Sequence, residues 1–158
     1  MAENLEIREM RPEEREALVD LIVSVFEKTS IAKNIAESFG AINGVPWQED
    51  KADHARKDLE NSDVVLVGEI EGKPAAVLTL TYNRKFATGS MGHLAVAARF
   101  QGRGVGRSML GEGFARLESD GLKYAAIDCL DQNAGAEGLY KSEGFVEVAR
   151  KVMMFRAL

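Results

Sequence analysis

The chain divides into short apolar runs with a period of two and longer stretches whose apolar residues recur every three or four positions. Residues 5–10 alternate apolar and polar side chains, which predicts a half-buried first strand. Pro12 suits the first turn of a helix, and the acidic residues after it favour a helix N-terminus. This helix is predicted to end near Lys28, with an apolar face made by Leu18, Leu21, Ile22, Val25 and Phe26.

The pattern weakens between residues 29 and 61. Apolar residues at helical spacing over 31–42 indicate a short helical piece, which glycines and a proline interrupt. Residues 48–59 are mostly polar, with sparse apolar positions. They predict a surface helix that ends near Asn61.

The middle of the chain is rich in β-branched and other apolar residues. Residues 64–70 and 74–82 predict two antiparallel strands joined by a hairpin at 71–73. A longer turn at 83–89 leads into a fourth strand that ends at 94–96. The remaining predicted elements are a helix over 105–117, a strand over 124–130, a helix over 134–142 capped by Asn133, and a closing pair of strands over 145–148 and 151–155.

These elements predict an α/β (α+β) fold in a single domain, residues 1–158, with a mixed, mostly antiparallel central sheet of about seven strands flanked by about four helices. Only the two strand–helix–strand units late in the chain are of the parallel type. A chain of 158 residues with 46% hydrophobic and 28% charged residues can bury a core without disulfide or metal support. No second domain is needed.

Charge and composition narrow the class of ligand. The net charge of −5 disfavours a broad nucleic-acid surface, while Arg99, Arg103 and Arg107 concentrate positive charge at one spot, which suggests a small anionic ligand. One cysteine and two histidines offer neither an internal disulfide nor a zinc site. The start of the chain lacks a basic, then apolar, leader, and no apolar run approaches the length of a membrane span. We therefore expect a soluble, cytoplasmic protein.

Three glycines at alternate positions, Gly102, Gly104 and Gly106, lie between the fourth strand and the next helix. Glycines leave backbone N–H groups uncovered, and the first N–H groups of a helix lack partners, so this loop suits a phosphate or pyrophosphate. A dinucleotide fingerprint starting at Gly102 would need a glycine where Arg107 stands, and the Gly-Lys-Ser or Gly-Lys-Thr ending of a P-loop is missing. The sequence instead matches Gln/Arg-x-x-Gly-x-Gly/Ala, from Gln101 to Gly106.

This pattern, directly after the strand that ends at 94–96, resembles the acetyl-coenzyme-A (acetyl-CoA) loop of GNAT-type N-acetyltransferases. A second segment, 133–145, is similar to the family's Asn-x-x-Ala-x-x-Leu-Tyr-x-x-x-Gly-Phe and follows one strand later. Two motifs in the family's order and at a fitting separation are hard to obtain by chance. The element order resembles the family's fold from end to end, with close residue-level resemblance over about 89–145.

The resemblance implies acetyl-CoA as cosubstrate and no metal. Loop amides would bind the pyrophosphate, and the nearby arginines would supply charge for it or for the 3′-phosphate, unless they are merely solvated surface groups. Backbone groups of 94–96 would pair with the pantetheine arm like one more strand, with an N–H near Val96 facing the thioester oxygen. The residues expected at the coenzyme are Leu94, Ala95, Val96, Gln101, Gly102, Arg103, Gly104, Val105, Gly106, Arg107 and Asn133, the last of which also suits a helix cap.

Tyr140 stands at the family's general-acid position. Transfer of its proton to a thiol is uphill by about 2 kcal/mol with ordinary pKa values, so we expect Tyr140 to act at least partly as a hydrogen-bond donor to the developing thiolate. The alternative is an aromatic side chain that only packs on the inner face of its helix.

The general base is open at this level. Many relatives carry a carboxylate two residues before the Leu of the Leu-x-Val strand, and here that residue is Gly92. His93 is a candidate base. The alternative is that it faces a helix and serves packing, which we favour because no orienting partner is visible in the sequence. Ala98 stands where relatives often have proline, and Cys129, inside an apolar strand, is expected in the core.

The resemblance implies an N-acetyltransferase that moves an acetyl group from acetyl-CoA to an amine of a small molecule or peptide by direct transfer in a ternary complex. The alternative is a non-catalytic acyl-CoA-binding sensor or partner-binding module of the same fold. Trp47 and Phe39 are candidate walls of the acceptor pocket, or parts of a packed loop. The acceptor, the acyl group and a possible homodimer stay open, and no nucleic-acid or membrane partner is expected.

Overall fold

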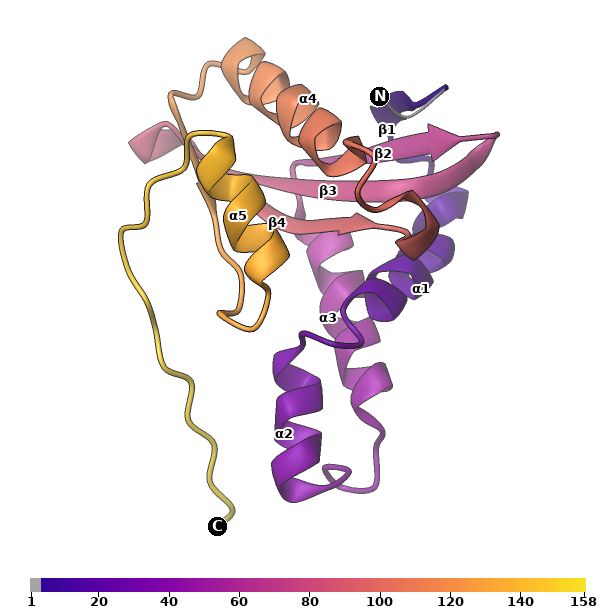
Figure 1. Ribbon diagram of the computed structural model, residues 1–158, viewed down its shortest axis with the longest axis vertical. Helices are drawn as coiled ribbons and strands as arrows, with labels where there is room; N and C mark the ends of the chain where they lie inside the picture. Colours follow the sequence, from indigo (N-terminus) through magenta and orange to yellow (C-terminus); the bar gives the residue numbers. More distant parts are fainter. Residues whose placement is uncertain (1–3) are drawn as a thin grey trace.

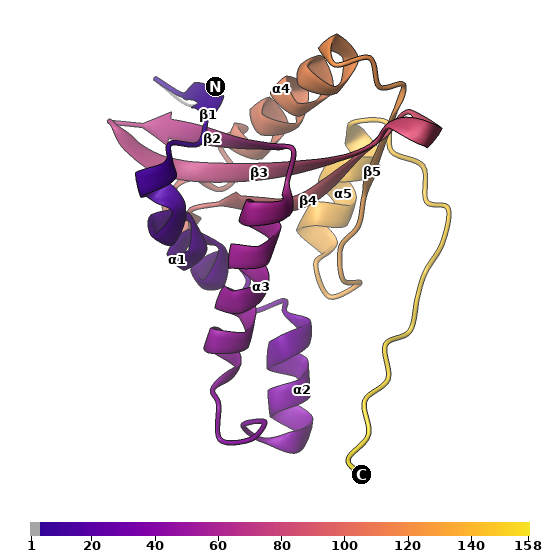
Figure 2. The same ribbon diagram turned by 180° about the vertical axis from the view of Figure 1, so that it is seen from behind.

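A five-stranded sheet crosses the molecule in the order β1-β2-β3-β4-β5, with helices on both of its faces (Figures 1 and 2). The computed structural model describes residues 4–158. Strands β1 to β4 pair antiparallel with their neighbours, and β5 pairs parallel with β4. The strands are β1 (Glu6–Glu9), β2 (Val64–Ile70), β3 (Lys73–Asn83), β4 (Thr88–Val96) and β5 (Tyr124–Ile127).

Five α-helices are present in residues 4–158, one more than the sequence predicts. The short helical piece expected over 31–42 is a full helix, because Ser30 caps its start by accepting a hydrogen bond from the Lys33 N–H at 3.4 Å. The helices are α1 (Arg15–Val25), α2 (Ile31–Phe39), α3 (Trp47–Asn61), α4 (Val105–Ser119) and α5 (Ala134–Ser142), with short 3₁₀ turns at Pro12–Glu14, Arg84–Phe86 and Ala98–Phe100.

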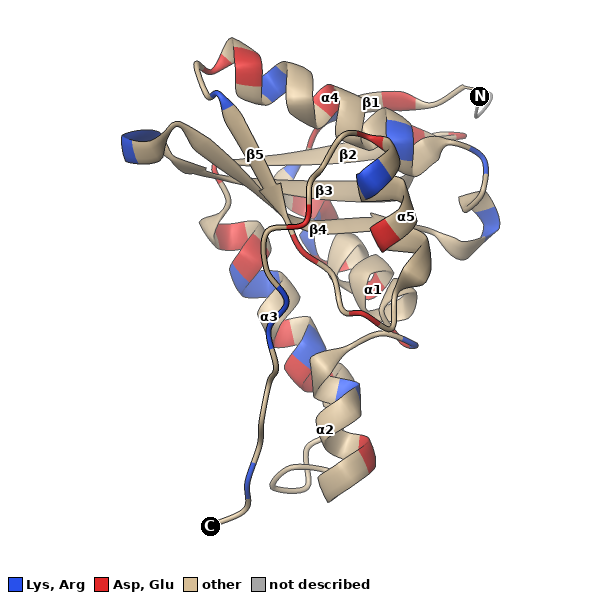
Figure 3. Cartoon of the chain, turned by 60° about the vertical axis from the view of Figure 1, so that its left-hand side comes forward, with Lys and Arg blue, Asp and Glu red and all other residues tan. Residues whose placement is uncertain are grey.

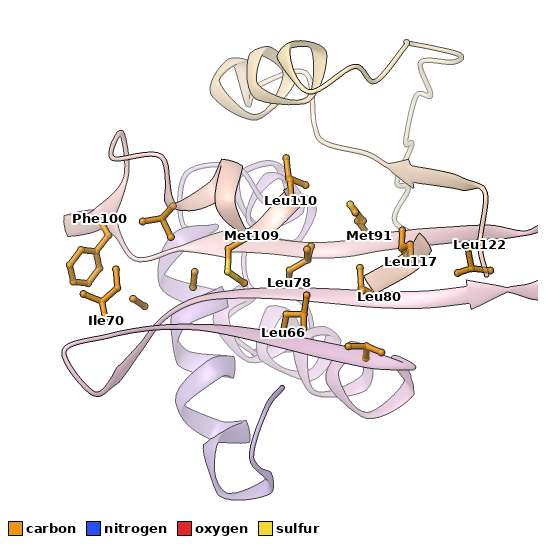
Figure 4. Close-up of a cluster of buried hydrophobic side chains, with 14 residues drawn as sticks. Leu66, Ile70, Leu78, Leu80, Met91, Phe100, Met109, Leu110, Leu117 and Leu122 are labelled. Carbon is orange, nitrogen blue, oxygen red and sulfur yellow. The ribbon is translucent and has the colours of Figure 1, made fainter. Parts of the chain in front are cut away.

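Each face of the sheet buries its own apolar cluster. Helices α1 and α3 cover one face, and α3 carries acidic and basic residues along its outer surface, as a surface helix does (Figure 3). Helix α4 covers the other face, where side chains from the sheet meet those of the helix (Figure 4). The cluster under α1 and α3 contains Leu18, Val19, Ile22, Ala55, Leu59, Val65, Val67, Val77 and Ala95, and the labelled residues of Figure 4 belong to the cluster under α4.

Helix α4 lies close on the sheet because glycines leave room for larger side chains. A Cβ added at Gly113 would stand 2.7 Å from Leu78 Cδ2, and one at Gly89 would overlap the Leu117 side chain. A side chain at either position would push the helix away from the sheet. The close fit holds the C-terminal half of α4 against β3 and β4.

The prediction of seven strands is wrong, because the closing pair over 145–148 and 151–155 does not form. After Gly144 the chain runs extended and makes no strand pairing within residues 4–158 (Figures 1 and 2). Val146, Val148 and Val152 are more than 80% exposed. The β-branched and other apolar residues of the segment allow a strand, but its sequence does not supply the neighbouring strand that the ladder hydrogen bonds require.

The strand predicted over 124–130 is shorter than expected, since β5 ends at Ile127. Cys129 therefore lies beyond the strand and is exposed, so the expectation that it belongs to the core is wrong. None of the helices found in residues 4–158 combines the length and the apolar character needed to span a membrane.

Candidate active site

Strands β4 and β5 separate halfway along β4. Their parallel pairing runs from Thr88 to Met91 and stops there, so residues 92–96 have no strand partner on the β5 side (Figure 2). The Ala97 N–H bonds to the Ala75 carbonyl on the β3 side, at 2.8 Å. Because successive N–H groups of a strand point to opposite edges, the Val96 N–H points toward the unpaired edge.

The glycine loop follows this open edge directly. Gly102 and Gly104 have φ angles of 73° and 81°, which only glycine adopts without strain, and Gly104 is the N-cap of α4. A Cβ added at either glycine would have no atom within 4 Å, so the loop backbone is open. The Gln101 side chain ties the loop to the strand, since its Nε2 donates to the Val96 carbonyl at 2.8 Å.

The three arginines near the loop have different surroundings. The guanidinium groups of Arg99 and Arg103 lie over the Phe100 ring, at 4.5 Å and 5.9 Å from its centroid. Arg107 turns instead toward the end of α5, where its Nε donates to Glu143 Oε1 at 2.5 Å. Arg99 and Arg103 therefore stay beside the loop, whereas the Arg107 charge is already paired.

Helix α5 packs against the start of α4. A Cβ at Gly106 would stand 3.3 Å from Leu139 Cδ2 and 3.8 Å from Val96 Cγ2, so only a very small residue lets strand, loop and helix meet here. Asn133 caps α5, with its Oδ1 accepting from the Ala136 N–H at 3.1 Å. The two sequence motifs thus lie side by side at the end of β4.

Tyr140 lies on α5 and packs against the cluster under α4, with its ring in edge contact with Phe145 at a centroid distance of 6.0 Å. Burial, with smaller contributions from Cys129 and Asp128, raises the pKa of Tyr140 to about 12. No hydrogen bond joins its hydroxyl to another residue within 4–158. Full proton transfer to a thiol would then cost about 5 kcal/mol, which favours hydrogen-bond donation over transfer.

His93 lies on the other face of β4, where it meets groups from α1 and α3. Its Nδ1 is 2.6 Å from Asp58 Oδ2, and its Nε2 is 3.0 Å from Lys51 Nζ. The Phe26 ring stands edge-on to the imidazole, with centroids 5.6 Å apart. The expectation that His93 has no orienting partner is wrong, although the expectation that it faces a helix is confirmed.

Burial acts on both charged neighbours of His93. Burial lowers the pKa of the Lys51 ammonium, and the Asp58 and Asp50 carboxylates, which raise this pKa, offset the effect only partly. For Asp58, burial alone would raise the pKa, but hydrogen bonds from His93 and Thr79 outweigh it, and the pKa lies below its ordinary value. Asp58 is therefore a carboxylate at neutral pH.

Sequence reasoning missed Asp58, Lys51 and Thr79. The first two are seven residues apart on α3, which places them on one face of the helix, but a helical pattern does not show what that face meets. Trp47 lines a separate cavity of about 580 Å³ between α1 and α3, and Phe39 packs on Phe155 with centroids 5.0 Å apart. Within residues 4–158, neither Trp47 nor Phe39 forms an aromatic pair with His93 or Tyr140, whose ring partners are Phe26 and Phe145. Within residues 4–158, no group of three or more His, Cys, Asp or Glu side chains is arranged to hold a metal ion.

Comparison with known proteins agrees with this arrangement. The family model of the acetyltransferase (GNAT) family matches residues 30–145, which is well over half of the chain. The chain belongs to the GNAT acetyltransferase family. A comparison with curated protein sequences finds no match.

Solved GNAT structures share the fold at low sequence identity. The PaiA N-acetyltransferase from Thermoplasma acidophilum, in complex with coenzyme A, is 14% identical over 90% of each chain, with a TM-score of 0.71. The ribosomal-protein-S18-alanine N-acetyltransferase from Escherichia coli is 20% identical, over 92% of this chain and 79% of its own, with a TM-score of 0.67. An aminoglycoside acetyltransferase from an uncultured soil metagenomic sample, in complex with sisomicin, is 18% identical over 98% of this chain and 96% of its own, with a TM-score of 0.64.

Proposed function

We propose that this GNAT chain is an N-acetyltransferase that moves the acetyl group of acetyl-CoA to an amine of a small molecule or peptide, by direct transfer in a ternary complex. The observation that carries the proposal is the open edge of β4, which runs into a glycine loop at the N-terminus of α4, beside Tyr140. Family membership supports the reaction class.

The donor side fits acetyl-CoA. The open loop backbone at Gly102 and Gly104 and the first N–H groups of α4 suit the pyrophosphate, and Arg99 and Arg103 lie beside them. The unpaired edge at 94–96 can pair with an extended amide-containing arm as a further strand would. The Val96 N–H then faces the thioester carbonyl, where it stabilises negative charge on the oxygen.

The chemistry requires one bond to form and one to break. The neutral acceptor amine attacks the thioester carbon, the new C–N bond forms, and the C–S bond breaks to release the thiolate. Tyr140 donates a hydrogen bond to the thiolate sulfur, while His93 accepts one proton from the acceptor nitrogen. The two side chains reach β4 from opposite faces, which suits donor and acceptor arriving from different sides.

The direct test is thiol release from acetyl-CoA in the presence of polyamines, amino acids, aminoglycosides, peptides and simple alkylamines. We expect release that depends on the amine and a product heavier by one acetyl group in mass spectrometry. Release that no amine stimulates, together with tight CoA binding in calorimetry, would instead establish the non-catalytic acyl-CoA-binding module. Parallel assays with succinyl-CoA decide whether the acyl group is acetyl only.

We also propose a homodimer, because the segment 146–158 leaves apolar side chains uncovered. Val146, Val148, Val152 and Met154 are each at least 81% exposed, and the outer edge of β5 carries no further strand within residues 4–158. The segment carries the basic residues Lys151 and Arg156, whereas Asp128 and Asp131 follow β5, and Arg150 pairs within the chain with Glu137 and Glu147. A second copy offers both the free edge and the opposite charge.

A further inference from the structure

Three elements build a hydrogen-bonded chain around His93. Asp58 and Lys51 come from α3 and bind the two ring nitrogens of the imidazole, at 2.6 Å and 3.0 Å. The side chains of His93 and Asp58 are 16% and 27% exposed, so this chain is mostly withdrawn from water. Hydrogen bonds between charged groups in such surroundings hold a geometry firmly.

The Asp58 carboxylate is fixed from a second side. Thr79 is fully buried on β3. Its hydroxyl donates a hydrogen bond to Asp58 Oδ2 at 2.7 Å and accepts one from the backbone N–H of His93 at 2.8 Å. A Cβ on Gly92 would stand 2.5 Å from the Thr79 hydroxyl oxygen and 3.0 Å from Asp58 Oδ2. Because Gly92 has no side chain, the Asp58 carboxylate of α3 can lie close against β4.

The hydrogen bonds assign the tautomer of the imidazole. A carboxylate can only accept, so the proton lies on Nδ1, and Nε2 presents its lone pair to the Lys51 ammonium. The ammonium also lies over the face of the Phe26 ring, 4.5 Å from its centroid. The place of the Lys51 Nζ is thus built for a primary ammonium group, with a lone pair and an aromatic face both directed at it.

We propose that Asp58 positions His93 as the base, and that Lys51 caps His93 by occupying the place where the amine of the acceptor gives up its proton. The inference rests on the proposed function and names its acceptor class, a primary alkylamine that enters as an ammonium ion. When the acceptor binds, the flexible Lys51 side chain withdraws, and the acceptor ammonium takes its place at Nε2. One proton then passes from the acceptor nitrogen to Nε2, and the resulting imidazolium is stabilised by Asp58. The neutral amine attacks the thioester carbon, and the second proton that its nitrogen loses passes to the departing thiolate, which leaves as the thiol.

The test of positioning uses Asp58→Asn, with Glu60→Gln, an exposed site on the same helix, as its control. Nitrogen-15 spectra of the ring are readily assigned, because the chain has only His54 and His93. We expect the wild type to show the Nδ1–H tautomer alone and Asp58→Asn to lose this preference, with kcat lower by about 10²-fold. Retention of either the single tautomer or the wild-type kcat in Asp58→Asn overturns the positioning role.

The test of capping uses Lys51→Met, which keeps the length of the side chain, with the exposed Lys57→Met as its control. We expect kcat/KM for a primary alkylamine to rise about tenfold, the effect of one hydrogen bond to a charged group. An unchanged or lower kcat/KM overturns capping. This arm stays decisive if Asp58→Asn does not fold.

The pH profile separates the two neighbours by sign. The groups that face the imidazole are Asp58 and Lys51 from α3, Thr79 from β3 and Phe26 from α1, and Asp50 acts on Lys51. Loss of the carboxylate destabilises the imidazolium, so the acidic limb of kcat/KM moves to lower pH in Asp58→Asn. Loss of the ammonium moves it to higher pH in Lys51→Met, and shifts of the opposite sign contradict the inference.

The nitrogen-15 spectra report the tautomer of His93 whether or not the protein acetylates an amine. If no amine is acetylated, the proposed function fails while the spectra still report on the Asp58–His93 pair. If amines are acetylated and both variants behave as the wild type, the function stands and the inference fails.

Discussion

At the scale of single residues, Tyr140 offers the sharpest test of the chemistry. Tyr140→Phe keeps the ring that packs against Phe145 and removes only the hydroxyl, which has no hydrogen-bond partner within residues 4–158. We expect kcat to fall by about 10²-fold while the affinity for CoA, measured by calorimetry, stays unchanged. A variant with the wild-type kcat would leave Tyr140 with packing as its sole role.

Gly92 gives a second prediction at this scale. In Gly92→Ala the new methyl group meets the Thr79 hydroxyl at 2.5 Å, so we expect a loss of about 1–3 kcal/mol in the free energy of unfolding. Gly111→Ala is the matched control, since a Cβ there meets nothing within 4 Å and alanine favours a helix. Urea unfolding should show opposite signs for the two variants, and equal values would contradict the close contact at Gly92.

At the residue scale, the sequence points to candidate site residues where they belong to a continuous motif. The glycine loop and Tyr140 belong to two continuous segments, and the structure brings these segments together through Gly106 and Leu139. Asp58 and His93 are 35 residues apart and meet only because α3 packs on β4. A sequence pattern shows the face that each element offers, but not which residues of two elements meet.

At the scale of elements, an ion-paired cluster ties the first strand to the turn before α1. Arg8 on β1 binds Glu14 at 2.6 Å and Glu69 of β2 at 2.6 Å. The hydrogen bond from Arg8, supported by the Arg11 backbone, lowers the pKa of Glu14 to about 2 against the opposing effect of burial. The cluster thus joins β1, β2 and the 3₁₀ turn Pro12–Glu14.

This cluster predicts how stability depends on pH. The pKa of Glu14 is lower in the folded than in the unfolded chain, so its contribution is complete above the ordinary glutamate pKa of about 4.5 and is lost as the pH falls toward about 2. The wild type should therefore lose more stability than Glu14→Gln between these two pH values. Denaturant unfolding at a series of pH values checks this, and parallel curves for the two proteins would contradict it.

Elements with strong local signals are the ones that sequence predicts. The hairpin of β2 and β3, helix α4 and the capped α5 all lie within a few residues of their predicted bounds. Helix α2 forms as a regular helix although its sequence pattern is weak, and the Ser30 side chain caps its first turn. The two missing strands are rich in β-branched and other apolar residues, but whether they form depends on a partner far along the chain.

At the scale of the whole molecule, the sheet order and the two helical layers determine where the site lies. Helix α4 holds the glycine loop at the end of β4, while α3 brings Asp58 and Lys51 to the opposite face of the same strand. The residues proposed for acetyl-CoA binding and those proposed for the acceptor thus lie on either side of the only stretch of β4 that β5 leaves unpaired within residues 4–158. The family resemblance predicts the residues proposed for acetyl-CoA binding. The residues proposed for the acceptor come together only because α3 packs on β4.

The uncovered C-terminal segment provides the last test, which concerns the assembly. Deletion of residues 146–158 removes side chains that are mostly exposed, together with the exposed pair of Arg150 and Glu137 and the contact of Phe155 with Phe39. These contribute little to the isolated fold, so we expect the midpoint of thermal unfolding, measured at a dilution where the full chain is monomeric, to change by only a few degrees.

The same deletion should abolish the homodimer, since it removes the apolar residues that a second copy would cover. Light scattering at rising protein concentration then gives a dimer for the full chain and a monomer for the shortened one. Replacing Val148 and Val152 by Thr in the full chain is the milder control, because it keeps the length and the alternation while reducing the apolar surface. A full chain that stays monomeric, or a shortened chain that still dimerises, would place the interface elsewhere or remove it.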